Sequence, residues 1–122
     1  MKKLLIVEDD IYTQDILPRA VNENYDFEVI IAKDGKEGLE RILTESPDII
    51  ILDIALPQMD GITMLERLRF THDYVKANII VVTAAADTHT ISKCKALGVA
   101  EYVIKPFTPT DIFDAINKTF NR

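Results

Sequence analysis

Cysteine and long hydrophobic runs are both scarce in this chain, and each scarcity excludes a class of protein. Cys94 is the only cysteine, so no disulfide can form within the chain, and we expect its side chain to pack in a helix. No apolar run approaches the roughly 18–20 residues that cross a bilayer. The apolar run from Leu4 to Val7 ends after four residues at three acids, which indicates a strand and not a signal peptide. These features predict a cytoplasmic protein that does not contact a membrane.

Basic residues are too few and too dispersed for a nucleic-acid-binding surface. The chain has 14 Lys and Arg against 20 Asp and Glu, a formal net charge of −6. Phosphate backbones are bound by clustered basic residues, so the sequence argues against direct nucleic-acid binding. Repeats, linkers and low-complexity segments are also missing, and 122 residues suffice for one hydrophobic core. We therefore expect a single domain over residues 1–122.

Five short apolar segments alternate with segments of helical spacing. The apolar segments show little polar alternation, as is typical of parallel strands covered on both faces. They are Lys3–Val7, Phe27–Ile31, Asp48–Leu52, Asn78–Thr83 and Glu101–Ile104. We expect Pro18 to kink or divide the first helix, and Thr110 to be the N-cap of the last one. Five β-α units in a row predict an α/β fold, a doubly wound open sheet with helices on both faces.

Polar residues stand where these strands end. In a doubly wound sheet, functional groups gather beyond the carboxyl ends of the strands. Here the strands run into Glu8-Asp9-Asp10, Asp53, Thr83 and Lys105. Two carboxylates about 5 Å apart repel each other by roughly 3 kcal/mol at an effective dielectric constant near 20. The acids therefore need cations nearby, and Lys105 supplies only one charge.

Magnesium fits this donor set. Glu8, Asp9 and Asp53 sum to −3, against +2 for Mg²⁺ and +1 for Lys105. Oxygen-only ligands favour Mg²⁺ (or Mn²⁺) over zinc, and neither histidine lies at these strand ends. A metal, an ammonium group and a hydroxyl around an acid are the parts of a phosphoryl-transfer site, with Asp53 as the nucleophile. Because no glycine-rich phosphate loop occurs, the phosphoryl donor would be another protein or a small phosphate ester.

The chain resembles the receiver domains of two-component response regulators (the CheY-like family) essentially from end to end. Glu8-Asp9 matches the acidic pair that binds the metal, and "LDIALPQMDG" matches the phosphoacceptor motif with Asp53 as the acceptor. "VVTA" brings Thr83 to the hydroxyl position of the family, and "YVIKPF" brings Lys105 to its invariant lysine. The resemblance implies a flavodoxin-like (βα)5 fold whose five parallel strands lie in the order 2-1-3-4-5.

The resemblance also implies roles for further residues. The backbone carbonyl of Ala55 would bind the metal together with the three acids, and the Lys105–Pro106 peptide bond would be cis. On phosphorylation Thr83 would move toward the phosphoryl group, and Tyr102 would turn inward behind it. Such a switch is a shift between two packings of the same chain.

The partners implied by the resemblance are proteins. The phosphoryl donor would be a histidine kinase or a histidine phosphotransfer protein. A downstream protein or effector domain would bind the surface formed by the helix around Cys94, the strand Glu101–Ile104 and the last helix. The chain would catalyse only the phosphorylation and dephosphorylation of its own aspartate, and it would not be a turnover enzyme.

Two other functions are less consistent with these residues. A receiver-like module can bind partners without phosphorylation, but such modules normally lose the acceptor, an acid or the lysine, and none is missing here. A magnesium-dependent phosphatase of the haloacid dehalogenase type carries a second Asp two residues after its nucleophile. Here Ala55 follows Asp53 at that spacing and Ile11 follows Asp9, which makes the phosphatase unlikely. A single-domain regulator and a receiver cut from a longer protein are both compatible with the sequence.

Overall fold

The apolar segments form one five-stranded parallel sheet in the computed structural model, which describes residues 1–73 and 75–120. The strands are β1 Lys3–Val7, β2 Glu28–Ala32, β3 Ile49–Leu52, β4 Asn78–Thr83 and β5 Glu101–Ile104. Their order is β2-β1-β3-β4-β5, which confirms the predicted fold. β3 begins one residue later than predicted. β2 is displaced by one residue, because both backbone groups of Phe27 hydrogen-bond to the Asn22 side chain.

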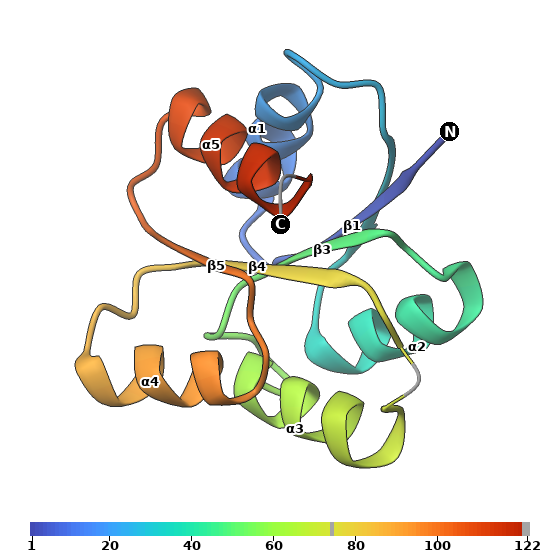
Figure 1. The fold of residues 1–122 in the computed structure, drawn as a ribbon, viewed down its shortest axis with the longest axis vertical. Helices are drawn as coiled ribbons and strands as arrows, with labels where there is room; N and C mark the ends of the chain where they lie inside the picture. The colour runs from blue at the N-terminus through green and yellow to red at the C-terminus, as the bar shows by residue number, and fades with distance from the viewer. Residues whose placement is uncertain (74, 121–122) are drawn as a thin grey trace.

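The helices cover both faces of this sheet (Figure 1). They are α1 Ile11–Val21, α2 Gly35–Glu45, α3 Gly61–Thr71, α4 Thr88–Ala96 and α5 Pro109–Phe120. Alternate strand residues point to opposite faces, so Leu4 and Ile6 pack with α1 and α5, whereas Leu5 and Val7 pack with the other three helices. We call these two apolar groups the α1/α5 cluster and the α2/α3/α4 cluster. Both faces of the sheet are buried, which explains why the strands read as continuous apolar runs.

Aspartates set the starts of four helices. The side chains that accept a hydrogen bond from the backbone N–H three residues ahead are Asp10, Asp34, Asp60 and Asp87. These caps satisfy N–H groups that have no partner inside the helix. α1 runs through Pro18 as one helix, so Pro18 does not divide this segment, and a kink at Pro18 stays a prediction.

The start of α5 corrects the prediction for Thr110. Thr108 and Asp111 exchange hydrogen bonds: the Thr108 N–H donates to Asp111 Oδ2 at 2.9 Å, and the Asp111 N–H donates to Thr108 Oγ1 at 3.2 Å. This reciprocal pair is a capping box, and it puts the cap two residues before Thr110. Pro109 is then the first helical residue, where its missing N–H costs nothing.

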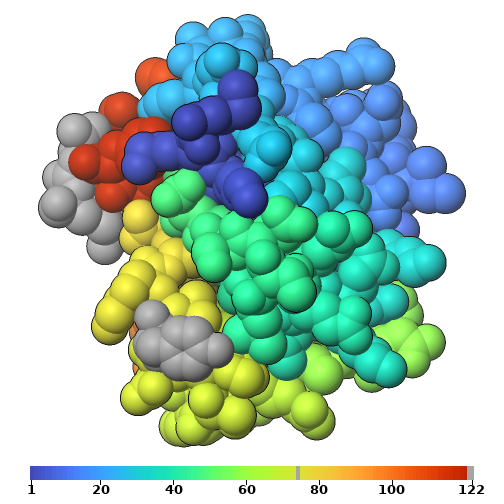
Figure 2. All heavy atoms as spheres, turned by 90° about the vertical axis from the view of Figure 1, so that its right-hand side faces the viewer, coloured from blue at the N-terminus to red at the C-terminus, as the bar shows by residue number. Residues whose placement is uncertain are grey.

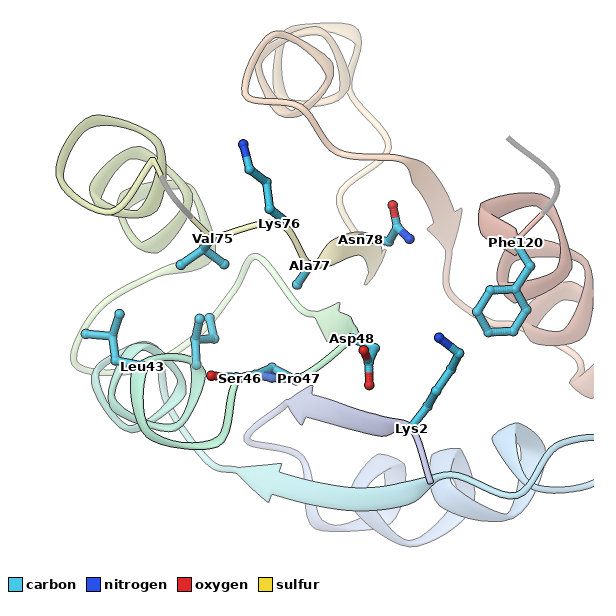
Figure 3. Close-up of a pocket in the computed structure, with 11 residues that line it drawn as sticks. Lys2, Leu43, Ser46, Pro47, Asp48, Val75, Lys76, Ala77, Asn78 and Phe120 are labelled. Atoms are coloured by element: carbon cyan, nitrogen blue, oxygen red, sulfur yellow. The ribbon is translucent and has the colours of Figure 1, made fainter.

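A hollow of about 460 Å³ lies at the amino ends of the central strands. Figure 3 shows the side chains of Lys2, Asp48 and Asn78 around it, each next to the start of a strand. Beside it the Lys2 ammonium lies 5.8 Å from the ring centroid of Phe120. Figure 2 shows this side of the molecule, with the first residues next to the end of α5. The hollow is therefore at the opposite edge of the sheet from the acids. No helix within residues 1–73 and 75–120 is long and apolar enough to cross a membrane.

Gly35 fixes how α2 meets the loop that follows β3. A Cβ atom at Gly35 would overlap the backbone carbonyl oxygen of Met59, and neither backbone can give way easily. Alanine normally stabilises a helix by up to about 1 kcal/mol over glycine. Here the close approach of two backbones reverses that preference.

We expect Gly35→Ala to lower the free energy of unfolding by about 1–3 kcal/mol, the usual cost of overpacking. Urea unfolding measures this change. Lys36→Ala, at the exposed neighbouring position of the same helix, is the matched control and should be close to neutral. A Gly35→Ala protein as stable as Lys36→Ala would contradict the close contact.

Candidate functional site

The carboxyl ends of β1, β3 and β5 bring an ion-pair network together. Lys105 follows β5, and its ammonium group donates to Glu8 Oε1 at 2.6 Å and to Asp53 Oδ2 at 2.9 Å. Glu8 and Asp53 are only 2% and 7% exposed. Charges that deeply buried are stable only when they are paired, so the lysine is what permits two acids at the rim of an apolar sheet.

The strand register puts the two acids side by side. Val7 is aligned with Leu52 in the β1–β3 pairing, so the next residues of both strands, Glu8 and Asp53, leave the sheet at the same level. The Asp53 N–H still donates to the Val7 carbonyl at 3.0 Å, and the Glu8 N–H donates to the Ala32 carbonyl at 3.0 Å. Backbone hydrogen bonds therefore hold both acids in place before any ligand binds.

Asp9 completes a group of three acids. One carboxylate oxygen from each of Glu8, Asp9 and Asp53 lies within 4.8 Å of the others. With Lys105 the group carries a net charge of −3 + 1 = −2, which one divalent cation neutralises. The donors are all oxygen atoms, so the set suits a hard ion such as Mg²⁺. Asp10 does not belong to the group, because its Oδ2 accepts from both the backbone and the hydroxyl of Thr13.

The electrostatics of the network follow from burial and pairing. Burial raises the pKa of Glu8 above its usual value and the charge of Asp53 adds to this effect, while the Lys105 ammonium opposes it. Burial by itself would lower the pKa of Lys105, but the hydrogen bonds to Glu8 and Asp53 outweigh it and hold that pKa above its usual value. Lys105 therefore stays a cation throughout the physiological pH range.

The second oxygen of Asp53 meets the loop that follows. Oδ1 accepts from the Ala55 N–H at 3.2 Å, and Ala55 itself is exposed. The role of the Ala55 carbonyl as a metal ligand stays a prediction. The Lys105–Pro106 peptide bond is cis.

Thr83 and Tyr102 meet at one loop residue. Thr83 ends β4 almost fully buried, and its Oγ1 accepts from the Ala85 N–H at 3.4 Å. The Tyr102 hydroxyl donates to the Ala85 carbonyl at 2.6 Å, and its ring packs on the α2/α3/α4 cluster. Tyr102 therefore already points inward, the position that the resemblance assigns to the phosphorylated form. Burial raises its pKa to about 12.

Sequence reasoning missed Gln14. Its side-chain amide donates to the Glu8 backbone carbonyl at 2.6 Å and so ties α1 to the loop that carries two of the acids. A glutamine on a helix gives no sequence signal of such a role, because the bond depends on how the helix leaves the loop.

Comparison with known proteins supplies a family. The sequence model described as "Response regulator receiver domain" matches residues 4–117. The chemotaxis protein CheY of Bacillus subtilis is 31% identical over 120 residues, which cover 98% of each chain. The probable C4-dicarboxylate response regulator DctR of Halalkalibacterium halodurans is 36% identical over 107 residues, 87% of this chain but 46% of DctR. This chain thus spans about half the length of that relative.

Solved structures agree with the sequence comparison. The CheY-like response regulator receiver domain protein of Methanospirillum hungatei JF-1 superposes with a TM-score of 0.88 at 29% identity. The match covers 99% of this chain and 94% of that one. The likeness therefore extends over the whole βα order and is not confined to the acidic motif.

Substitution of Asp9 tests the metal site and leaves the buried ion pair of Lys105 with Glu8 and Asp53 unchanged. Removing one of three crowded negative charges should make Asp9→Asn more stable than the wild type when no divalent ion is present. The wild type should gain about 2.7 kcal/mol of unfolding free energy at a Mg²⁺ concentration 100 times the dissociation constant. Asp9→Asn should lose most of that gain. Urea unfolding with and without Mg²⁺ measures both, with exposed Asp114→Asn as the control. An undiminished Mg²⁺ effect in Asp9→Asn would remove Asp9 from the site.

The pH dependence of the unfolding free energy tests the inward packing of the Tyr102 phenol. Its pKa of about 12 lies above the roughly 10 of an unfolded chain, so the neutral phenol favours the folded state. That contribution is complete below about pH 10 and is lost as the pH rises toward 12. Between about pH 10 and 12 the wild type should therefore lose more stability than Tyr102→Phe. Urea midpoints at several pH values give the comparison, and exposed Tyr12→Phe should behave as the wild type. Equal slopes for all three proteins would contradict the inward packing of the phenol.

Proposed function

This chain belongs to the family of response regulator receiver domains, which are phosphoacceptor signalling modules, and from that premise we propose that Asp53 accepts the phosphoryl group. One observation carries the proposal. The ammonium of Lys105 lies between the Glu8 and Asp53 carboxylates, with Asp9 close by. An acid held against a fixed cation beside further acids is arranged for phosphoryl transfer.

The transfer step uses the Asp53 carboxylate as the nucleophile. One of its oxygens forms a bond to phosphorus, and the bond from phosphorus to the donor nitrogen breaks. The electron pair of that bond stays on the imidazole nitrogen of a phosphohistidine donor. Lys105, 2.9 Å from Asp53 Oδ2, stabilises the charge on the incoming phosphoryl oxygens. Thr83 donates a hydrogen bond from its hydroxyl to one of those oxygens.

The acidic group fits a divalent cation. Three carboxylates and one ammonium leave two negative charges, and no nitrogen or sulfur donor occurs in the group. We assign Glu8, Asp9 and Asp53 as ligands of Mg²⁺, or of Mn²⁺, with the Ala55 carbonyl as a fourth. When bound, the ion neutralises charge on the phosphoryl oxygens. Hydrolysis then returns the acid: water attacks phosphorus, the bond to Asp53 breaks, and inorganic phosphate leaves.

The output of the switch is the surface of α4, β5 and α5. Thr83 and Tyr102 both bond to Ala85, so a pull on Thr83 by the phosphoryl group changes the loop on which the Tyr102 hydroxyl rests. The phosphoryl group then shifts the population of two packings, and the downstream protein or effector domain binds one of them.

The phosphoryl donor is a protein, a histidine kinase or a histidine phosphotransfer protein. Ile11 and Tyr12 are 81% and 71% exposed, and they follow directly after the acidic loop. Large apolar side chains so exposed are typical of a protein-binding surface. A partner that covers the start of α1 brings its phosphohistidine next to Asp53.

The proposed function also covers the domain organisation, the mode of action and the location of the protein. We take residues 1–122 as one receiver domain, which works by protein contact and not by direct contact with nucleic acid. Its own acyl phosphate chemistry is its only catalysis, as expected for a signalling module. A cytoplasmic location stays a prediction from the sequence.

Acetyl phosphate tests the acceptor. We expect the intact mass to rise by one phosphoryl group in the presence of Mg²⁺, and not after chelation of divalent ions. Asp53→Asn should gain nothing. Asp60→Asn is the matched control from the same loop: Asp60 caps α3 through the Thr63 N–H at 2.9 Å, and asparagine caps equally well. This variant should be phosphorylated as the wild type is. A folded wild type that never gains mass would favour the phosphorylation-independent binding module.

A further inference from the structure

α4 is held to the rest of the molecule by few contacts. Cys94 is the one buried side chain among residues 88–96, all of which the structure describes. It packs in the α2/α3/α4 cluster, the same cluster that the Tyr102 ring joins. Elements with little buried apolar surface open and shift at low free-energy cost. The position of α4 therefore depends strongly on each further contact that it makes with the rest of the protein.

Arg69 supplies such a contact at the end of α4. Its Nε donates to the Leu97 carbonyl at 2.7 Å, and its Nη2 donates to the Gly98 carbonyl at 3.3 Å. These carbonyls follow the last turn of α4, where the helix dipole is negative and a cation is favoured. The Glu66–Lys93 pair also joins the two helices, but its side chains are 40–44% exposed and 3.7 Å apart, so it contributes little.

Gly98 is shaped for this contact. Its φ of +84° lies in the left-handed region, and the N–H groups of Gly98 and Val99 close the helix end on the Lys95 and Cys94 carbonyls. A Cβ atom at Gly98 would lie only 3.0 Å from the Arg69 guanidinium. The guanidinium thus lies directly against the turn that ends α4.

The other end of α3 rests on the phosphoacceptor. α3 begins at Gly61, whose N–H donates to the Ile54 carbonyl at 2.8 Å. A Cβ atom at Gly61 would lie 2.7 Å from the backbone oxygen of Asp53. α3 is therefore a rigid connection from the backbone of Asp53 to the end of α4, separate from the one through Thr83 and Tyr102.

We propose that Arg69 is a positioning residue that couples α4 to the phosphoacceptor through α3. The Arg69 hydrogen bonds and the inward Tyr102 occur in the same structure. Arg69 therefore holds α4 in the arrangement that accompanies an inward Tyr102. The inference rests on the proposed function, because it adds a second route by which the state of Asp53 reaches the output surface.

Arg69→Met tests this, because methionine keeps the apolar stem and removes the donors. Arg67→Met, at an exposed position of the same helix, is the matched control. We expect Arg69→Met to speed amide hydrogen exchange in residues 88–99 by roughly three- to tenfold, with β1 and β3 unchanged. Its affinity for beryllofluoride with Mg²⁺, a mimic of the phosphoryl group, should fall by about threefold or more in calorimetric titration. Arg67→Met should change neither.

The outcomes separate coupling from a mere helix cap. Faster exchange in α4 with undiminished beryllofluoride affinity would make Arg69 a structural cap and overturn the proposal, as would exchange equal to that of Arg67→Met. If Arg69→Met loosens the whole protein, Arg69→Lys decides: it should recover part of the affinity and protection, and full wild-type behaviour of α4 would overturn the proposal. A wild type that binds neither beryllofluoride nor a phosphoryl group would count against the proposed function. The exchange comparison needs neither ligand, so it still decides whether Arg69 holds α4.

Discussion

The hydrogen bonds of Lys105 to two buried carboxylates are the constraint on which the rest of this structure depends. Glu8 and Asp53 are at the ends of strands that are apolar on both faces, where an unpaired charge costs several kcal/mol. Lys105 offsets only part of this, and the group keeps two negative charges with Asp9 included. The crowded charges therefore lower the stability of the protein when no cation is bound, and a bound divalent cation would restore it. A fold that is otherwise dominated by aliphatic packing tolerates this because the network occupies one edge of the sheet.

The strands and the grouping of the candidate site could be predicted from local rules, whereas the order of the strands was implied by the resemblance to receiver domains. Apolar runs covered on two faces form parallel strands, and parallel strands bring their carboxyl ends to one edge, so Glu8, Asp53 and Lys105 had to meet. Local rules were insufficient where two neighbours compete for one role. Asp9 and Asp10 look alike in sequence, yet the turn into α1 points Asp10 at Thr13 and leaves Asp9 with the acids. Thr108, and not Thr110, caps α5, because only Thr108 has an acid three residues ahead, at Asp111.

Contacts between distant segments could not be predicted from the sequence. Arg69 bonds to carbonyls 28 and 29 residues away, and backbone carbonyls carry no residue identity that a pattern could reveal. The Gln14 bond to the Glu8 carbonyl is hidden for the same reason. The orientation of Tyr102 is a different case. Its inward position depends on the hydrogen bond to the Ala85 carbonyl and on packing against the cluster that contains Cys94, and neither contact can be read from Tyr102 alone.

The two apolar clusters lie on opposite faces of the sheet, and only one of them is next to the residues of the proposed switch. The α1/α5 cluster packs α1 and α5 against the sheet through fully buried side chains such as Leu17 and Ile116. The α2/α3/α4 cluster contains Cys94 and the buried residues of α3 that precede Arg69, and the Tyr102 ring packs against it. In the proposed function, a change at Asp53 would reach α4 through the α2/α3/α4 cluster on one side of the sheet. Because a domain of this size has only about 5–15 kcal/mol of stability, a switch that repacked both clusters would threaten the fold, whereas one carried by the α2/α3/α4 cluster would leave the α1/α5 cluster packed.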